Sequence, residues 1–442
     1  MRKVLKYAFR TLLVLLSLPL ICIVLLYVPT VQEFALHKAV GPVSKALGME
    51  LSVGGLRLAF PLRLTVEQLR LVDRTDTLVD CGRLRLDVDP WPLLRKKAVV
   101  RAFGIERLTA RYRDSVTGFG LQLTAGRLGM EQAAADLRTR KAAVGRIVLD
   151  DTEAFLRPGS SESVEKPDTT EALPWTIDLA AIVIRNTSFE METAPDIRGL
   201  TVQVGEAGAD TCRVELGGQQ VSVAHFRLDR SACTYLTLPK GTETEQAAPE
   251  VQPEAEPSAQ PWTVRIGEIA LTEDQVTYSV WGHHPTAGFD PEYIQISGLE
   301  LSLDSLRNRG SDIALQIRQL AFKERCGLSV EQTRGRFEMG PEGIALTGFD
   351  LTTRNSHIRA DVKTGPGILQ TNPAAPLTAD AEADVNTAEL ALLAPSLLPA
   401  PLDNRPLRLH LAANGTLEEL ARIGLELSSP GHLALTVDGT AK

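Results

Sequence analysis

The sequence predicts a mainly β protein that is tethered to a membrane by one N-terminal helix. An uncharged apolar run occupies residues 11–28, and most of the chain after Leu51 consists of short stretches in which apolar and polar residues alternate. Alternation with a period of two is typical of strands with one buried and one wet face, and it favours antiparallel pairing. We therefore expect a transmembrane helix and a short amphipathic helix, followed by an elongated antiparallel β-sheet with disordered acidic loops.

The apolar run is long enough to cross a membrane once. Its 18 residues would span roughly 27 Å as a helix, close to the thickness of a bilayer's hydrocarbon core. Four basic residues within 1–10 predict a cytoplasmic tail, which leaves the rest of the chain outside the cytoplasm. A cleaved signal peptide is the alternative, but its apolar core is shorter and no A-x-A pattern follows this run. The predicted anchor residues are Leu12, Leu13, Leu15, Leu16, Leu18, Leu20, Ile21, Ile23, Leu25 and Leu26.

A second helix is expected over residues 29–48. Thr30 and Glu33 form a capping-box pattern, apolar residues then recur at steps of three and four, and Gly48 suits the C-terminal end. We expect this amphipathic helix to cap the first strands of the β-body. The alternative is a helix that lies on the membrane surface. In both cases the apolar positions of the helix are Leu36, Val40, Val43 and Leu47.

The first β unit is predicted over residues 49–157. Its opening stretch alternates between apolar residues and the polar Arg57, Arg63, Thr65 and Glu67, which predicts one strand, or two joined at Pro61. A second stretch alternates with Arg83, Arg85, Asp87 and Asp89 in the same way. The apolar residues of the two stretches are Leu56, Leu58, Phe60, Leu62, Leu64 and Val66, and then Leu84, Leu86 and Val88.

Two later segments resemble copies of one unit. PWTIDLAAIVIRNTSFEM begins at Pro174 and PWTVRIGEIALTEDQVTYSV begins at Pro261, so the offset is 261 − 174 = 87 residues. In each copy one step of three residues interrupts the alternation, which predicts a bulge or a short turn. The matching apolar positions are Ile177, Leu179, Ile182, Ile184 and Phe189 in the first copy, and Val264, Ile266, Ile269, Leu271 and Val276 in the second.

Acidic, proline-rich stretches separate these units. Residues 158–173 and 239–260 are poor in apolar side chains, so we expect both to be disordered loops inserted between strands. The β units then cover 174–238 and 261–442, with a short helix at 387–398 that ends before Pro399.

The sequence contains no recognisable catalytic or metal-binding motif. Nucleotide-binding, serine-hydrolase and zinc-protease patterns are absent, and no C-x-x-C spacing occurs among the five cysteines. His283 and His284 are adjacent, so on a strand they would point in opposite directions, and only a loop would let them share a metal ion. The net charge of −8 and the lack of a basic tract beyond residues 1–10 argue against nucleic acid. We expect no enzyme activity, no catalytic residue, no metal and no cofactor.

The cysteines outside the anchor are expected to be free. Cys212 and Cys233 are the only tempting pair, and a meander of strands near 211–216, 219–228 and 232–238 would place them on strands that flank a middle one. Strands lie about 4.8 Å apart, so the pair would be nearly 10 Å apart, which is too far for a disulfide.

Several phrases resemble the AsmA-like family of envelope proteins, and in particular TamB-type subunits of the translocation and assembly module. The likeness begins with Leu69, Leu71 and Asp73, continues through the strand of residues 77–88, and includes Pro92–Lys97. Repeat phrases at Gly343–Val362 and Ala383–Leu398 extend it. TamB-type chains are usually far longer and end in a characteristic domain, so this chain is either a fragment or a shorter relative.

The resemblance implies an inner-membrane protein with a single span and a periplasmic body. It also implies that the long β-sheet curls into an open trough, a repeating β-groove, whose apolar face moves phospholipid between the inner and outer membranes. The expected lining residues are Leu56, Leu58, Phe60, Leu62, Leu64, Val66, Leu84, Leu86, Val88, Ile177, Leu179, Val264 and Ile266.

Two other functions fit the same pattern. Family members are also linked to the assembly of outer-membrane or autotransporter proteins with an Omp85-type barrel partner, which a free sheet edge could pair with. A non-catalytic periplasmic spacer made of closed β-sandwiches would need the same alternation of apolar and polar residues for its core.

Overall fold

The computed structural model describes twenty strands, two α-helices and one short 3-10 helix. The chain divides into two compact units, residues 1–166 and 167–442, which we call the N-terminal and the C-terminal unit. The prediction of a mainly β protein with few helices is therefore confirmed. The described residues are 25, 27–73, 76–114, 116–159, 174–194, 197–239, 261–366, 374–393, 404–416, 420–431 and 433–441.

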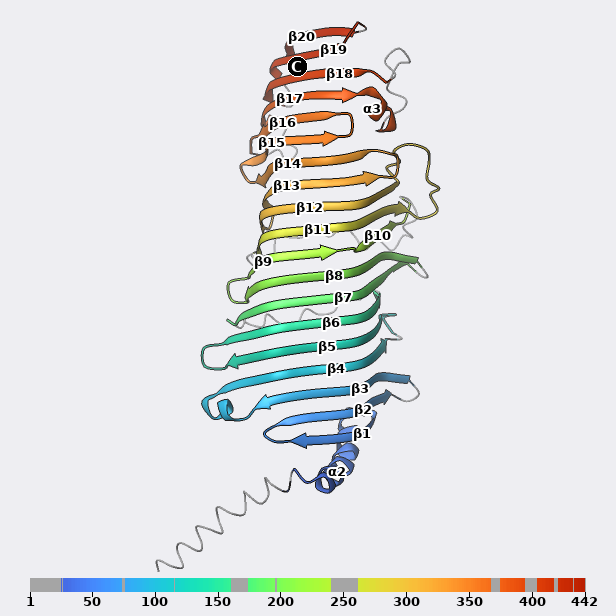
Figure 1. Cartoon of the computed structure of the whole chain (residues 1–442), viewed down its shortest axis with the longest axis vertical. Coiled ribbons are helices and arrows are strands. Elements are labelled where there is room, and N and C mark those ends of the chain that lie inside the picture. Colours follow the sequence, from blue (N-terminus) through green and yellow to red (C-terminus); the bar gives the residue numbers. More distant parts are fainter. Residues whose placement is uncertain are drawn as a thin grey trace, which may run out of the picture. The chain divides into compact units, whose positions relative to one another are not determined.

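The N-terminal unit is an antiparallel meander in which each strand pairs with the next (Figure 1). The helix α2 (Pro29–Leu47) precedes it, and the 3-10 helix η1 (Trp91–Arg95) joins β3 to β4. The strands are β1 (Glu50–Ala59), β2 (Arg63–Asp73), β3 (Asp76–Asp89), β4 (Lys97–Arg113), β5 (Gly120–Asp136) and β6 (Lys141–Arg157).

Helix α2 covers the free edge of β1, as expected. The side-chain amide of Gln32 donates to the carbonyl of Leu58 at 2.7 Å and accepts from its N–H at 3.1 Å, and the N–H of Leu51 donates to the hydroxyl of Ser44. These bonds occupy backbone groups of an edge strand that would otherwise be open to another chain.

The ends of α2 differ in part from the sequence prediction. Gly48, with φ of +67°, ends the helix as expected. The capping box at Thr30 is wrong, because the helix already begins at Pro29, and Val28 at the N-cap makes no side-chain bond. Proline suits the first helical position because its missing N–H has no partner there. The expected apolar face is partly wet, since Val43 is exposed.

The predicted anchor falls almost entirely outside the described residues. The tail 1–10 and all predicted anchor residues from Leu12 to Leu26, except the exposed Leu25, lie outside them. In the described part of the chain, no helix is long and apolar enough to cross a membrane.

The C-terminal unit contains fourteen strands and the short helix α3 (Thr387–Leu393). Neighbouring strands are antiparallel except around β11. The strands are β7 (Thr176–Ala194), β8 (Ile197–Glu215), β9 (Gln220–Asp229), β10 (Ala232–Thr237), β11 (Thr263–Val280), β12 (Tyr293–Arg309), β13 (Asp312–Glu324), β14 (Ser329–Gly340), β15 (Gly343–Thr353), β16 (His357–Thr364), β17 (Pro376–Asn386), β18 (Pro406–Thr416), β19 (Leu420–Ser429) and β20 (Leu433–Ala441).

Strands β9 and β10 lie end to end and act as one long strand. Both pair antiparallel with β8, and both pair parallel with β11. Our expectation of a meander with β9 between β8 and β10 is therefore wrong. The residues that join them, Arg230 and Ser231, are held in line because the Ser231 N–H donates to the buried carboxylate of Asp274 on β11 at 2.6 Å.

This arrangement also changes the reason why the cysteines are free. Cys233 on β10 pairs with Val202 of β8, which lies 212 − 202 = 10 residues from Cys212 on the same strand. The two cysteines are thus on the order of 30 Å apart along adjacent strands. Cys81, Cys212, Cys233 and Cys326 are all free, as predicted. Burial raises the pKa of the Cys81 and Cys212 thiols, which keeps them protonated and unreactive.

Helix α3 fixes the end of β17 to neighbouring loops. Its buried Glu389 accepts hydrogen bonds from the Thr353 hydroxyl at 2.6 Å and from the Asn355 N–H at 3.1 Å. The predicted helix over 387–398 is confirmed as far as Leu393, and residues 394–398 lie outside the described residues.

Candidate functional site

The candidate site is the apolar face of the sheet, and it begins with two uninterrupted rows in the N-terminal unit. Directly paired residues of antiparallel strands lie on the same face. One row crosses all six strands through Leu56, Val66, Leu84, Ile105, Leu128 and Leu149. The next crosses them through Leu58, Leu64, Leu86, Phe103, Met130 and Ile147. Six of the predicted lining residues lie in these two rows.

Two further rows continue the apolar face along the strands. They consist of Val53, Leu69, Cys81, Leu108, Ala125 and Thr152, and of Leu51, Leu71, Val79, Ala110, Leu123 and Ala154. Thr152 is the one polar member of the four rows. Its buried hydroxyl donates to the carbonyl of Asp150, so it presents no free donor.

A line of irregular positions separates the two pairs of rows. Gln68, Arg107 and Asp151 have left-handed backbone conformations with φ near +50°, and each faces a glycine on the neighbouring strand. A Cβ at Gly126 would lie 2.9 Å from the Cβ of Asp151, so only glycine fits there. We call the six residues the glycine line: Gly54, Gln68, Gly82, Arg107, Gly126 and Asp151.

The glycine line keeps the apolar residues on one face. Along β2 the apolar positions step from Val66 to Leu69, three residues on, so a regular strand would turn Leu69 to the opposite face. The left-handed Gln68 absorbs the extra residue, as a bulge does. Since every strand of the unit carries the step at the same place, the four rows share one face.

The same device operates in the C-terminal unit. The predicted three-residue steps run from Leu179 to Ile182 and from Ile266 to Ile269. Left-handed residues stand beside both, but on the neighbouring strands, at Thr211 and Ser305. Rows cross from β7 through Leu179, Cys212, Val223, Ile266 and Leu306, and through Ile182, Ala209, Phe226, Ile269, Leu303 and Ile317. Ile177 and Val264 lie in a third row that Asn308 interrupts.

Two predicted lining residues lie off the face. Phe60 and Leu62 belong to the turn between β1 and β2, where Pro61 cannot donate to the sheet, and Phe60 is 73% exposed. Of the two predicted options, the structure has two strands joined at Pro61. Val88 is at the end of β3, where it pairs with Val100.

Within each unit the described elements leave this face uncovered. Each strand's contacts are with its hydrogen-bonded neighbours, and the described helices pack on β1, β4 and β17. The row residues are mostly half-buried rather than buried. Across the described residues, the fully buried apolar side chains are Cys81, Ala125, Ala207, Cys212, Val330 and Ala375. A packed two-layer core would bury many more apolar side chains than these.

The opposite face is charged and solvated. Arg83 pairs with Glu106 at 3.3 Å and with Glu67 at 3.8 Å, all on one row across β2, β3 and β4. In the C-terminal unit, Asp178 pairs with Arg213 at 2.6 Å. Such exposed pairs add little stability, and their main effect is to keep this face wet.

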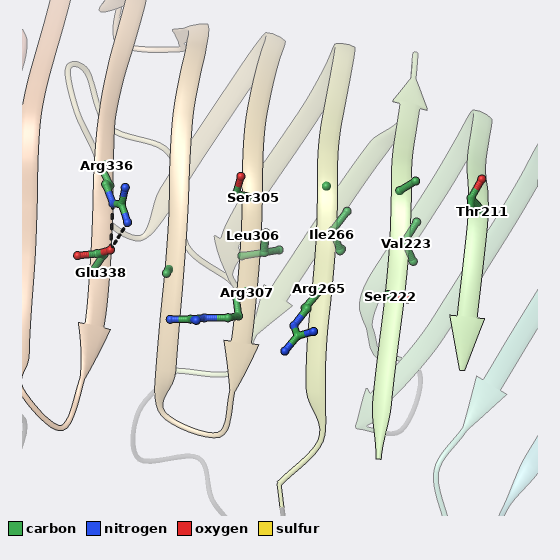
Figure 2. Close-up of a pocket in the computed structure, with 13 residues that line it drawn as sticks. Thr211, Ser222, Val223, Arg265, Ile266, Ser305, Leu306, Arg307, Arg336 and Glu338 are labelled. Atoms are coloured by element: carbon green, nitrogen blue, oxygen red, sulfur yellow. Dashed lines mark hydrogen bonds and ion pairs between the residues drawn. The ribbon is translucent and has the colours of Figure 1, made fainter. Parts of the chain in front are cut away.

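The C-terminal unit contains a hollow of about 570 Å³ whose lining includes three arginines as well as apolar residues (Figure 2). Arg265 and Arg307 pair directly across β11 and β12, and no carboxylate of the described chain lies within ion-pair distance of either. Arg336 is neutralised by Glu338 on its own strand. The hollow can therefore attract an anion, although its lining also includes the row residues Val223, Ile266 and Leu306.

The adjacent histidines do not form a metal site. His283 binds the buried carboxylate of Asp290 at 2.7 Å and the exposed carboxylate of Glu292 at 2.9 Å. The hydrogen bond from His283, with others from Thr286, holds the pKa of Asp290 well below its usual range. The cluster fastens the loop between β11 and β12. The described residues contain no group of His, Cys, Asp and Glu arranged to hold a metal ion.

No family model, curated protein or solved structure matches the chain. The resemblance to AsmA-like and TamB-type proteins therefore stays a prediction that rests on the sequence phrases given above.

Proposed function

We propose that the chain is a non-catalytic, inner-membrane-anchored periplasmic protein that moves phospholipid between the inner and outer membranes, as its AsmA-like features suggest. The observation that carries the proposal is the set of uninterrupted apolar rows, such as that from Leu58 to Ile147, on a face that the described elements leave open.

The rows suit an acyl chain energetically. Each CH2 of a lipid tail costs about 0.8 kcal/mol when it is exposed to water. Neighbouring members of a row are separated by one strand spacing, about 4.8 Å, so a tail that slides across the sheet always contacts the next apolar side chain. The four rows of the N-terminal unit contain no charged residue, so no charge is left without water when a tail covers them.

The glycine line supports an open trough rather than a flat sheet. Bulges bend strands and increase their twist. Because the irregular positions align across all six strands, from Gly54 to Asp151, they would bend the strands together and make the face between them concave. A concave apolar surface contacts more of a tail than a flat one does.

Lipid analysis of the intact protein tests the proposal. The full chain is purified from membranes, washed, and its lipids are measured by mass spectrometry. We expect bound phospholipid in the native protein, a strong loss in Leu86→Glu, and no loss in the matched control Arg85→Glu, whose side chain lies on the charged face. A native protein without phospholipid, or a Leu86→Glu variant that unfolds instead of losing lipid, would refute it.

The two other functions stand differently. A spacer of closed β-sandwiches would need a second layer packed over the rows, whose residues are mostly half-buried rather than buried. Assembly of outer-membrane proteins with an Omp85-type barrel stays a prediction, and crosslinks between this chain and a barrel protein in intact envelopes are its test.

A further inference from the structure

One end of the strands of the N-terminal unit differs from the rest of its surface. In an antiparallel meander, every second connection lies at the same end. The β1–β2 turn, η1 and the β5–β6 turn therefore lie together, at the left of the view in Figure 1. We call residues 60–62, 90–96 and 137–141 the loop edge.

The loop edge exposes large apolar side chains. Phe60 is 73% exposed, Trp91 67% and Leu94 83%, and Leu93 and Leu137 are also exposed. Single exposed apolar residues are ordinary, but several together on one edge mark a surface that contacts something apolar.

The loop edge also carries cations without partners. Asp89 and Asp136 are already bound by Arg101 at 2.9 Å and Lys97 at 3.2 Å. Within the described part of the chain, no carboxylate lies within ion-pair distance of the remaining exposed cations, Arg95, Lys96, Arg138, Arg140 and Lys141. The edge is therefore both apolar and positively charged.

The apolar run of residues 11–28 reaches the unit at this edge. Tyr27, which lies in that run, donates its hydroxyl to the carbonyl of Pro61 at 2.6 Å, and its ring meets that of Phe60 edge-on at 6.0 Å. The most apolar segment of the sequence therefore joins the folded body beside Phe60, and not at the opposite end of the strands.

We propose that the loop edge rests in the headgroup region of a bilayer that contains anionic phospholipid. Trp91, Leu93 and Leu94 then enter the interface, where tryptophan is favoured, while the unpaired cations contact lipid phosphates. This rests on the membrane-anchored function proposed above and locates its lipid entry. The row from Leu58 to Ile147 is the one nearest the loop edge, so it is the first to receive an acyl chain.

Fluorescence quenching of Trp91 tests this placement. Trp175, Trp262 and Trp281 are replaced by Phe in the full chain, which is reconstituted into vesicles of brominated phosphatidylcholine with or without phosphatidylglycerol. We expect the bromine to remove most of the Trp91 emission, more so with phosphatidylglycerol. Each cation near an anionic surface raises the equilibrium constant for docking about fivefold, so Arg138→Gln with Arg140→Gln should lower that constant roughly 25-fold.

The matched control places tryptophan at the other end of the same unit. Val116 is 85% exposed in the β4–β5 connection, and β4 alone has 17 residues, roughly 55 Å. In a Trp91→Phe background, the fluorescence of tryptophan at position 116 (Val116→Trp) should not be quenched by the brominated lipid. It should be quenched by acrylamide in the aqueous phase. Equal quenching at both positions, or none at Trp91, overturns the proposal. Retention of the chain in membranes after alkaline washing and the lipid analysis above are measured separately, so a failed placement and a failed function remain distinguishable.

Discussion

Replacing Gly126 with alanine should destabilise the N-terminal unit because the glycine line leaves no room for a side chain. The new Cβ would lie 2.9 Å from the Cβ of Asp151 and 3.4 Å from the carbonyl oxygen of Asp150. A Cβ is fixed by the backbone, so no rotamer change relieves the clash. Overpacking of this kind costs about 1–3 kcal/mol. A unit of this size loses about 2–4 °C in thermal midpoint for each kcal/mol.

Gly129 provides the control on the same strand. A Cβ there meets nothing closer than 3.8 Å, so Gly129→Ala should leave the midpoint unchanged or raise it slightly. Asp151→Gly should rescue Gly126→Ala, because it removes the opposing Cβ and suits the left-handed backbone at φ +52°. Circular dichroism melts of the full chain in detergent measure all four proteins. Equal midpoints for the two alanine variants, or no rescue, would refute the role of the glycine line.

Three further changes have defined outcomes. Gln32→Ala leaves the N–H and carbonyl of Leu58 without their partners, which should cost about 1–3 kcal/mol and speed hydrogen exchange at the Leu58 amide; unchanged exchange would contradict it. Arg307→Glu replaces a repulsive cross-strand pair with Arg265 by an attractive one, so the melting midpoint should rise by the equivalent of about 0.2–1 kcal/mol, and added salt should reduce the gain. Asp290→Asn removes a carboxylate whose pKa is lower in the folded state than its ordinary 3.8. The carboxylate stabilises the loop fully above about pH 3.8, and this stabilisation is lost as the pH falls through the pKa of the folded state. Hydrogen exchange in the loop should therefore differ between the native protein and the variant at neutral pH and become equal in acid.

The alternation of apolar and polar residues was enough to predict a mainly β chain, strands with one apolar and one polar face, and the irregular steps of the two repeat copies. It also identified Leu56, Leu58 and Leu64 as members of one apolar face, because the period of two fixes which side chains share a side. The free state of the cysteines followed from distance alone, although the strand order behind that reasoning was wrong.

What the sequence did not reveal depends on pairing between distant segments. The step from Leu179 to Ile182 indicated an irregularity, but the left-handed residue lies at Thr211 on the next strand, and only the register connects them. The continuity of β9 with β10 depends on Asp274, which is 43 residues from Ser231 in the sequence. The sequence left open whether one strand or two cover residues 56–66, because the alternation across Pro61 is the same in both cases.

The parallel pairing of β11 has a consequence for the order in which the chain folds. In the N-terminal unit each strand follows its partner after a short connection, so pairing can proceed from one strand to the next with low contact order. Between Thr237 and Thr263 the intervening stretch is 263 − 237 − 1 = 25 residues, and closing it rather than a connection of about four residues costs about 1.6 kcal/mol more in chain entropy. Until β11 arrives, β9 and β10 present an open edge to any other chain. This step should therefore be the slow one during synthesis, and the point at which mispairing and aggregation compete most strongly with folding.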